Sequence, residues 1–360
     1  MPPVVDPSNV YSQAGANLLT GAARSALPRV YVPDHGSNNV TVIDPATRRV
    51  LAVLPVGANP QHVVPSYDLS TLWVANNADG TNLGSLTPID PTTGRAGPAV
   101  AVDDPYNLYF TPDGAHAIVV AEARKRLDFR DPRTMRLQYS IDVRSCPGIN
   151  HMDFSLDGSY LIATCEDAGR LVKVDWTRRS VVATLELGTA ALPQDIRLAP
   201  DGRLFYVADM MGNRLILVDG DRLLIAGSVD LAASGGIGAH GLYPSRDARV
   251  LYVANRGSAG RVGVAPHGPG SVSVVDFATR QVVANWPVPG GGSPDMGGVS
   301  ADGTQLWLSG RYDNEVYVFD TRAGRLADRI TVGPAGREPH GLCVWPQPGR
   351  YSLGHTGNLR

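Results

Sequence analysis

Residues 195–219 read DIRLAPDGRLFYVADMMGNRLILVD, and this stretch decides the fold. Two apolar segments flank the PDG turn, and a third apolar segment ends in Asp219. Alternating apolar and polar residues on both sides of a glycine-containing turn are typical of a β-hairpin. An Asp before small or polar residues favours a further tight turn, because its carboxylate bonds the backbone two residues on. The stretch therefore predicts three consecutive antiparallel strands.

The pattern recurs seven times in the 360 residues. Its second turn falls at Asp44, Asp90, Asp131, Asp175, Asp219, Asp276 and Asp320, with spacings of 46, 41, 44, 44, 57 and 44. Its first hairpin begins at residues 62, 107, 151, 195, 241, 296 and 341. A fourth apolar strand follows each Asp turn, so each repeat supplies one four-stranded blade. Seven such units predict an all-β, seven-bladed propeller, with a loop insertion near residues 257–270 in the longest spacing.

The two ends of the chain complete each other. The first repeat lacks its inner strand, and the last inner strand, GLCVWP at 341–346, has no partners after it. We expect them to join in one blade, because closure removes open sheet edges. Residues 29–349 then form a single propeller domain, preceded by a solvated leader at 1–28. The tail at 350–360, which carries His355, is expected either to cross the channel mouth as a lid or to extend into solvent.

Composition excludes several functions. The net charge is −2, which argues against the basic surface that nucleic acids require. No run of 18 apolar residues exists, so no membrane span is expected. We expect a monomer that acts on a small molecule.

Three cysteines, Cys146, Cys165 and Cys343, allow at most one intrachain disulfide. Cys146 and Cys165 flank one predicted inner hairpin and are candidates for it, whereas Cys343 is expected to be a buried apolar residue. No signal peptide precedes the leader. We expect an extracytoplasmic protein, secreted or periplasmic, whose signal has been removed; the alternative is a cytoplasmic protein.

Segments such as TPDGAHAIVV (111–120), APDGRLFYVAD (199–209) and LYVAN (251–255) resemble the YVTN-type propeller repeat family. The resemblance covers roughly residues 29–345 and implies the propeller fold. The wider group is similar to the propeller of haem-d1 nitrite reductases. The resemblance does not imply one activity, because this fold carries many chemistries.

Four of the eight histidines occupy one repeat position, where each inner strand begins. In blade order this position holds His62, Asn107, His151, Asp195, His240, Asp295 and His340, although the last three lie one residue earlier. Because successive strand residues point to opposite faces, this slip turns the last three away unless the chain bends them back. Inner strands of a propeller line its channel, so the sequence predicts a ring of imidazoles at one mouth.

Imidazole nitrogens bind transition metals. The sequence therefore predicts a mononuclear metal on His62, His151, His240 and His340, with copper or iron favoured over zinc. Metal-bound histidines commonly pass their other N–H to a carboxylate or carbonyl, a role open to Asn107, Asp195 and Asp295. The alternative is that these are ordinary polar residues at a wet channel mouth.

Further candidates lie near the same mouth, and those at the ends of second strands are Glu122, Glu166, Asp209, Arg256 and Arg311. Asp195, Asp295 and Glu166 are the expected proton carriers. Asn107, Glu122, Arg256 and Arg311 are the expected substrate contacts, the two arginines suiting an anion. Asp209 is an additional acid candidate, and His35 is expected to be a turn residue.

Three functions follow. The first is a metal-dependent enzyme, an oxidoreductase acting on a small molecule. The second is a non-catalytic propeller that binds a ligand or protein through its loops. The third is a metal-independent lactonase or lyase with a histidine base.

Overall fold

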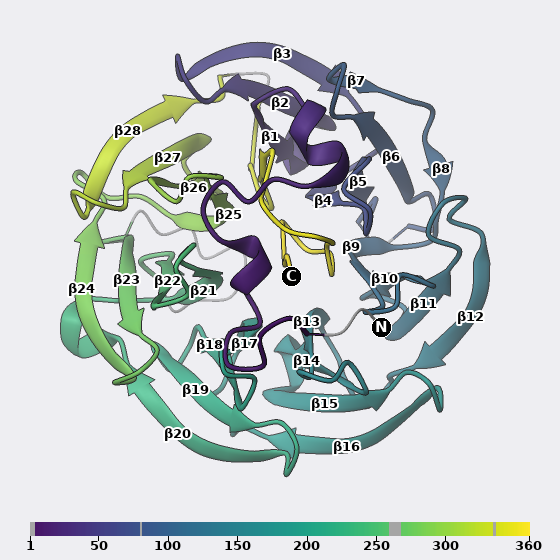
Figure 1. The fold of residues 1–360 in the computed structure, drawn as a ribbon, viewed down its shortest axis with the longest axis vertical. Helices are drawn as coiled ribbons and strands as arrows, with labels where there is room; N and C mark the ends of the chain where they lie inside the picture. Colours follow the sequence, from purple (N-terminus) through teal and green to yellow (C-terminus); the bar gives the residue numbers. More distant parts are fainter. Residues whose placement is uncertain (1–3, 80, 259–267, 334–335) are drawn as a thin grey trace.

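A computed structural model describes residues 4–79, 81–258, 268–333 and 336–360. Seven antiparallel sheets surround a central axis, and in six of them the first strand of the sheet lies near the axis and the last at the rim (Figure 1). The predicted seven-bladed propeller is therefore confirmed. Most of the expected insertion near 257–270 lies outside the described residues.

From the axis to the rim, the closing blade contains β29 (Cys343–Trp345), β1 (Arg29–Asp34), β2 (Asn39–Asp44) and β3 (Arg49–Pro55). The next two blades contain β4 (Pro60–Pro65), β5 (Leu72–Asn76), β6 (Ser85–Asp90), β7 (Arg95–Ala96) and β8 (Val100–Ala101), then β9 (Pro105–Phe110), β10 (Ala117–Ala121), β11 (Arg126–Arg130) and β12 (Leu137–Asp142).

The other four blades contain β13 (Ile149–Phe154), β14 (Leu161–Cys165), β15 (Arg170–Asp175) and β16 (Ser180–Glu186); β17 (Pro193–Leu198), β18 (Leu204–Asp209), β19 (Arg214–Asp219) and β20 (Leu224–Asp230); β21 (Ala239–Pro244), β22 (Val250–Asn255), β23 (Ser271–Asp276) and β24 (Gln281–Pro287); and β25 (Pro294–Val299), β26 (Gln305–Gly310), β27 (Glu315–Asp320) and β28 (Arg325–Thr331). Short 3-10 helices are η1 (Ser12–Ala14), η2 (Gly21–Ser25), η3 (His35–Ser37), η4 (Glu166–Ala168) and η5 (Ala232–Ser234). Among the described residues, no helix has the length and apolarity needed to cross a bilayer.

The Asp turns form as predicted. The Asp44 carboxylate accepts from the backbone N–H of Ala46 at 2.8 Å, and Asp320 accepts from Arg322 and Ala323 at 2.9 Å. The same bonding recurs in the other five blades, at Asp90, Asp131, Asp175, Asp219 and Asp276. This local chemistry sets the period of the fold.

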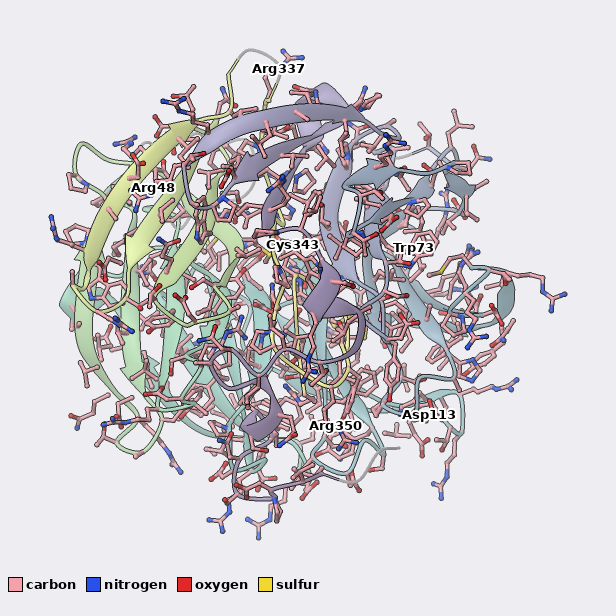
Figure 2. All side chains as sticks on the ribbon, turned by 45° about the horizontal axis from the view of Figure 1, so that its top comes forward. Arg48, Trp73, Asp113, Arg337, Cys343 and Arg350 are labelled. Carbon is pink, nitrogen blue, oxygen red and sulfur yellow. A yellow bond between two sulfur atoms is a disulfide. The ribbon has the colours of Figure 1, made fainter. Side chains whose placement is uncertain are left out.

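Both chain ends build the closing blade. Tyr31 of β1 pairs with Cys343 of β29, which confirms the predicted ring closure. Cys343 is fully buried and lies toward the middle of the molecule, whereas Arg48 and Arg337 lie toward its periphery (Figure 2). Elsewhere, Cys146 and Cys165 form the disulfide that the sequence left open.

The leader is not solvated, contrary to expectation. Val10, Tyr11, Ala14 and Ala23 are buried, and the Tyr11 hydroxyl donates to the carbonyl of Leu198 at 2.6 Å. The segment crosses the face on which the inner hairpins turn (Figure 1). Its apolar side chains make this packing favourable, since burial removes them from water.

The tail is neither a lid over the histidine mouth nor a strand in solvent. It enters the channel from the hairpin-turn face and adds to β9 (Figure 1). Phe110 N–H donates to Leu353 at 3.0 Å, and His355 N–H donates to Leu108 at 2.9 Å. The end of the tail is held by Asp153, which accepts from Arg360 at 3.1 Å. The tail therefore fills the channel and carries His355 into it.

Gly354 permits this insertion. Its φ is +101°, and an added Cβ would lie 2.4 Å from both the Leu108 oxygen and the Tyr109 Cα. We expect Gly354→Ala to lower the free energy of unfolding by about 2–4 kcal/mol, because strain and backbone overlap add. Gly188→Ala is the matched control, since its φ of +112° carries similar strain and no atom of the described residues lies within 4 Å of an added Cβ. Urea denaturation that finds equal losses for the two variants would contradict the close approach.

Candidate metal centre

A β-bulge begins six of the seven inner strands. In β13 the ladder register shifts by one between Ile149 and Met152, so that Asn150 and His151 lie opposite the single residue Thr164. The same shift occurs at the start of β4, β9, β17, β21 and β25. Bulges re-aim side chains and are common beside functional sites.

The bulge explains why the one-residue slip does not separate the histidines. His62 and His151 occupy its second position, whereas His240 and Asp295 occupy its first. Two residues share one opposing position there, so strict alternation of faces does not apply. All four histidines of the predicted ring are buried, with 0–2 % of their surface exposed.

Five imidazoles, rather than four, meet on the axis. The ring centroids of His62 and His340 lie 4.8 Å apart, and those of His240 and His340 lie 6.2 Å apart. His355 of the tail lies between two of the others, at 4.8 Å from His151 and 5.5 Å from His62. The structure thus brings together all four predicted ligands and adds a fifth histidine.

Hydrogen bonds set the tautomers of two rings. His62 Nδ1 lies 2.9 Å from the Tyr106 carbonyl, and His340 Nδ1 lies 3.0 Å from the Gln61 carbonyl. A carbonyl only accepts, so both Nδ1 atoms carry the proton and both Nε2 atoms keep a lone pair. A metal-binding histidine usually donates the N–H of its other ring nitrogen to such an acceptor.

Several polar atoms of the cluster lack a partner. Within the described part of the chain, Nε2 of His62, His151 and His355 is buried without a hydrogen bond. His355 Nε2 lies 3.4 Å from Asp195 Oδ2, outside the geometry of a hydrogen bond. A buried polar atom without a partner costs about 1–3 kcal/mol. The donor set therefore fits a transition metal, which would satisfy these nitrogens.

All five imidazoles are neutral at pH 7. Burial lowers the pKa of His62, His151, His340 and His355, and it lowers the pKa of His240 to about 4 with the help of Arg256. Neutral imidazole is the form that binds metal. The centre needs no proton release from these rings before an ion binds.

The two axial carboxylates differ. Asp195 Oδ2 accepts from Leu242 N–H at 2.9 Å, which ties two blades together. Asp295 Oδ1 accepts from Arg256 Nε at 2.7 Å, while its Oδ2 is buried, has no hydrogen bond to any described residue and lies 3.4 Å from His340 Nε2. Burial alone raises the pKa of Asp295, but Arg256 outweighs it and holds that pKa well below its usual range. Asp295 is thus an anion with a free oxygen on the cluster.

Asn107 lies behind two of the rings. Its Nδ2 is 3.3 Å from His151 Nδ1 and 3.2 Å from His355 Nδ1, while its Oδ1 accepts from Leu108 N–H at 2.8 Å. Binding of metal through Nε2 requires Nδ1–H to donate, which the amide permits after a half turn. This position suits ligand orientation more than the substrate contact expected from sequence.

Replacing Asn107 tests this role. We expect Asn107→Asp to tighten metal binding about tenfold, because a carboxylate accepts from both Nδ1–H groups and still holds Leu108 N–H. Asn107→Leu should weaken binding about 10–100-fold. Competition with a chromophoric chelator measures both affinities, and a weaker Asn107→Asp beside an unchanged Asn107→Leu would reject the assignment.

The mouth above the rings carries an aromatic ring and charged groups. Tyr106 packs against His62, with ring centroids 5.2 Å apart, and sequence reasoning missed it. Burial and the nearby Glu166 raise the pKa of Glu122 to about 8, so Glu122 is largely protonated at pH 7. Within the described residues, no carboxylate lies within ion-pair distance of Arg311, although only 9 % of Arg311 is exposed.

The remaining predicted residues take structural partners. Arg256 bonds Asp295 rather than facing the mouth unpaired, and Glu166 accepts from Asn150 Nδ2 at 3.2 Å. Asp209 accepts from Arg214 Nε at 2.9 Å. His35 begins η3 and lies between Asp79 and Glu338, at 2.8 and 2.9 Å.

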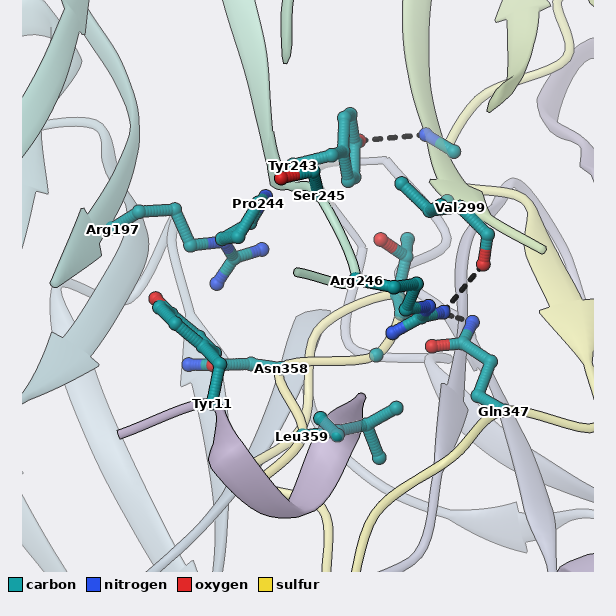
Figure 3. Close-up of a pocket in the computed structure, with 15 residues that line it drawn as sticks. Tyr11, Arg197, Tyr243, Pro244, Ser245, Arg246, Val299, Gln347, Asn358 and Leu359 are labelled. Atoms are coloured by element: carbon teal, nitrogen blue, oxygen red, sulfur yellow. Dashed lines mark hydrogen bonds between the residues drawn. The ribbon is translucent and has the colours of Figure 1, made fainter. Parts of the chain in front are cut away.

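A pocket lies on the other side of the tail. Tyr11 of the leader, Arg197, Tyr243, Gln347 and Leu359 line it (Figure 3). Gly297 N–H donates to the Tyr243 hydroxyl at 2.6 Å there, a bond drawn in Figure 3. The pocket lies between the leader, the tail and the blades, and none of the five imidazoles is among its lining residues.

The model of the YNCE-like beta-propeller family matches residues 2–348. The chain belongs to this family. No curated protein matches the YNCE-like chain. The match spans nearly the whole propeller, so the family assignment and the seven blades agree.

Solved structures similar to this YNCE-like propeller carry different names. A periplasmic gluconolactonase from Pseudomonas aeruginosa is 20 % identical, with a TM-score of 0.70 over 89 % of this chain and 99 % of that one. Kuenenia stuttgartiensis hydrazine synthase is 18 % identical, with a TM-score of 0.64 over 86 % and 96 %. The dihydro-heme d1 dehydrogenase NirN is 18 % identical, with a TM-score of 0.57 over 86 % and 64 %. At these identities the likeness shows the fold.

Proposed function

We propose that the protein is a metal-dependent enzyme, an oxidoreductase, that binds a transition metal on the axial imidazoles and acts on a small molecule. One observation carries the proposal: neutral, buried imidazoles converge from separate blades and the tail, and three of their Nε2 atoms have no partner within the described residues. Imidazole ligands suit copper and iron as well as zinc. A bound copper or iron ion would supply the electron transfer or oxygen chemistry that side chains lack.

The chain's own groups would handle the substrate. Arg311, unpaired within the described residues, suits an anionic substrate group. Glu122, with its pKa raised to about 8, holds a proton that it can pass to a substrate near neutral pH. Tyr106 packs edge-on against His62 and would lie beside a substrate at this mouth.

Metal analysis tests the proposal. The protein is purified without an affinity tag, analysed for metals, and then reconstituted separately with copper, iron and zinc. We expect at least one tightly held ion per chain. Fewer than about one tenth of an ion per chain after reconstitution rejects the metal function.

A metal-independent lactonase is the second candidate. It is supported by the fold likeness to the Pseudomonas aeruginosa gluconolactonase and by the neutral histidines, which can act as bases. Lactone hydrolysis that survives chelation and is lost in His151→Ala would favour it over the oxidoreductase.

We further propose an extracytoplasmic monomer. The Cys146–Cys165 disulfide supports this location, because such bonds persist in oxidising compartments. Fractionation of expressing cells and sedimentation of the purified protein test the location and the monomer separately.

A further inference from the structure

The axial ligands divide into two sets of three. His62, His151 and His355 form one set, and their ligand atoms lie within 4.8 Å of one another. His240, His340 and Asp295 form the other, with the same spread. Three protein ligands with an open position are the usual content of a catalytic metal site. Each set is therefore sufficient for one ion.

The two sets are neighbours. His62 of the first lies 4.8 Å from His340 of the second, measured between ring centroids, and His151 lies 6.4 Å from His240. Metal ions in two-metal sites are about 3.5–4 Å apart, which adjacent sets of this size can hold. The two sets differ in their ligands, since the first contains three imidazoles and the second contains two imidazoles and a carboxylate.

Unpartnered atoms occur in both sets. Among the described residues, Nε2 of His62, His151 and His355 is buried without a hydrogen bond, and so is Oδ2 of Asp295. His240 Nδ1 lies 2.9 Å from Asp295 Oδ1, the oxygen that also accepts from Arg256 Nε. One ion on the first set would leave the second set unsatisfied, and the reverse also holds.

Charge around the second set differs from that around the first. Asp295 supplies one negative charge to the cluster. Its Oδ1 accepts a hydrogen bond from Arg256, and its Oδ2 faces the cluster. Asp195 Oδ2 lies 3.4 Å from His355 Nε2, and this carboxylate places a negative charge beside the first set. A carboxylate with two imidazoles suits iron, manganese or zinc, whereas three imidazoles suit copper or zinc.

We propose that the channel binds two divalent transition-metal ions, one on His62, His151 and His355 and the other on His240, His340 and Asp295. This inference rests on the proposed metal function and replaces its single ion by a pair. It makes the tail a ligand-bearing part of the centre, because only the tail supplies the third ligand of the first set.

Zinc titration of the chelator-stripped, full-length protein tests the pair. Native mass spectrometry should find two zinc ions per chain, and one in each of His355→Gln and His240→Ala. His116→Ala is the control and should keep two, because His116 lies on a blade away from the channel. Circular dichroism checks that each variant is folded.

The outcomes separate the two proposals. One ion in the unchanged protein overturns the pair and leaves the metal function intact, whereas no ion overturns both. Two ions in both His355→Gln and His240→Ala overturn the ligand assignment. Loading with copper provides a second readout: the unchanged protein should show a spin-coupled or silent spectrum in electron paramagnetic resonance, and each single-site variant an uncoupled one.

Discussion

The double variant His62→Ala, His340→Ala should bind transition metal at least about 100-fold more weakly than the unchanged protein. Both rings donate Nδ1–H to a backbone carbonyl, at 2.9 and 3.0 Å, so both present Nε2 to the axis. They also contribute to opposite ligand sets. The double variant therefore removes one imidazole from each set, which no single histidine change does.

Competition with a chromophoric chelator measures this loss. His116→Ala serves as the control, because it removes an imidazole that takes no part in the axial cluster. The double variant should still unfold in one cooperative step, since the seven blades keep their strands and Asp turns. Metal affinity within about threefold of the unchanged protein would reject the axial histidines as the principal ligands.

Asp153→Leu should lower the free energy of unfolding by about 3–5 kcal/mol. Asp153 is fully buried and accepts from four groups: Phe154 N–H and Leu198 N–H, both at 2.8 Å, Asn358 Nδ2 at 2.7 Å and Arg360 Nη2 at 3.1 Å. Leucine of similar size accepts none of these. The buried Arg360 guanidinium is then left without its carboxylate, which costs more than the pair contributes.

Urea denaturation measures the loss, with Asp142→Leu as the matched control. Asp142 pairs with Arg144 on the surface, where both side chains are more than half exposed, so its loss should cost less than about 1 kcal/mol. The tail should also become sensitive to carboxypeptidase in Asp153→Leu, because its anchor is gone. Equal stability of the two variants would show that Asp153 does not hold the tail.

The repeats carry most of what sequence reasoning predicted correctly. Turns at Asp44 through Asp320 are local, because each carboxylate bonds the backbone two or three residues on. Strand alternation is equally local, and the ring closure follows from the incomplete first and last repeats. The histidine position was visible because the period aligns His62 with His151 and places His240 and His340 within one residue of the same position.

The sequence by itself determined the seven blades, their closure and the set of four histidines, since each depends on short-range bonding repeated at a fixed period. Only the tertiary structure decided that a bulge brings His240 beside His151, that Asn107 lies behind two rings, and that the tail inserts His355 into the channel. Leader and tail have no repeat to align with. Their positions depend on contacts with residues far away in the chain, such as Asp153 with Arg360, and those contacts exist only once the ring has closed.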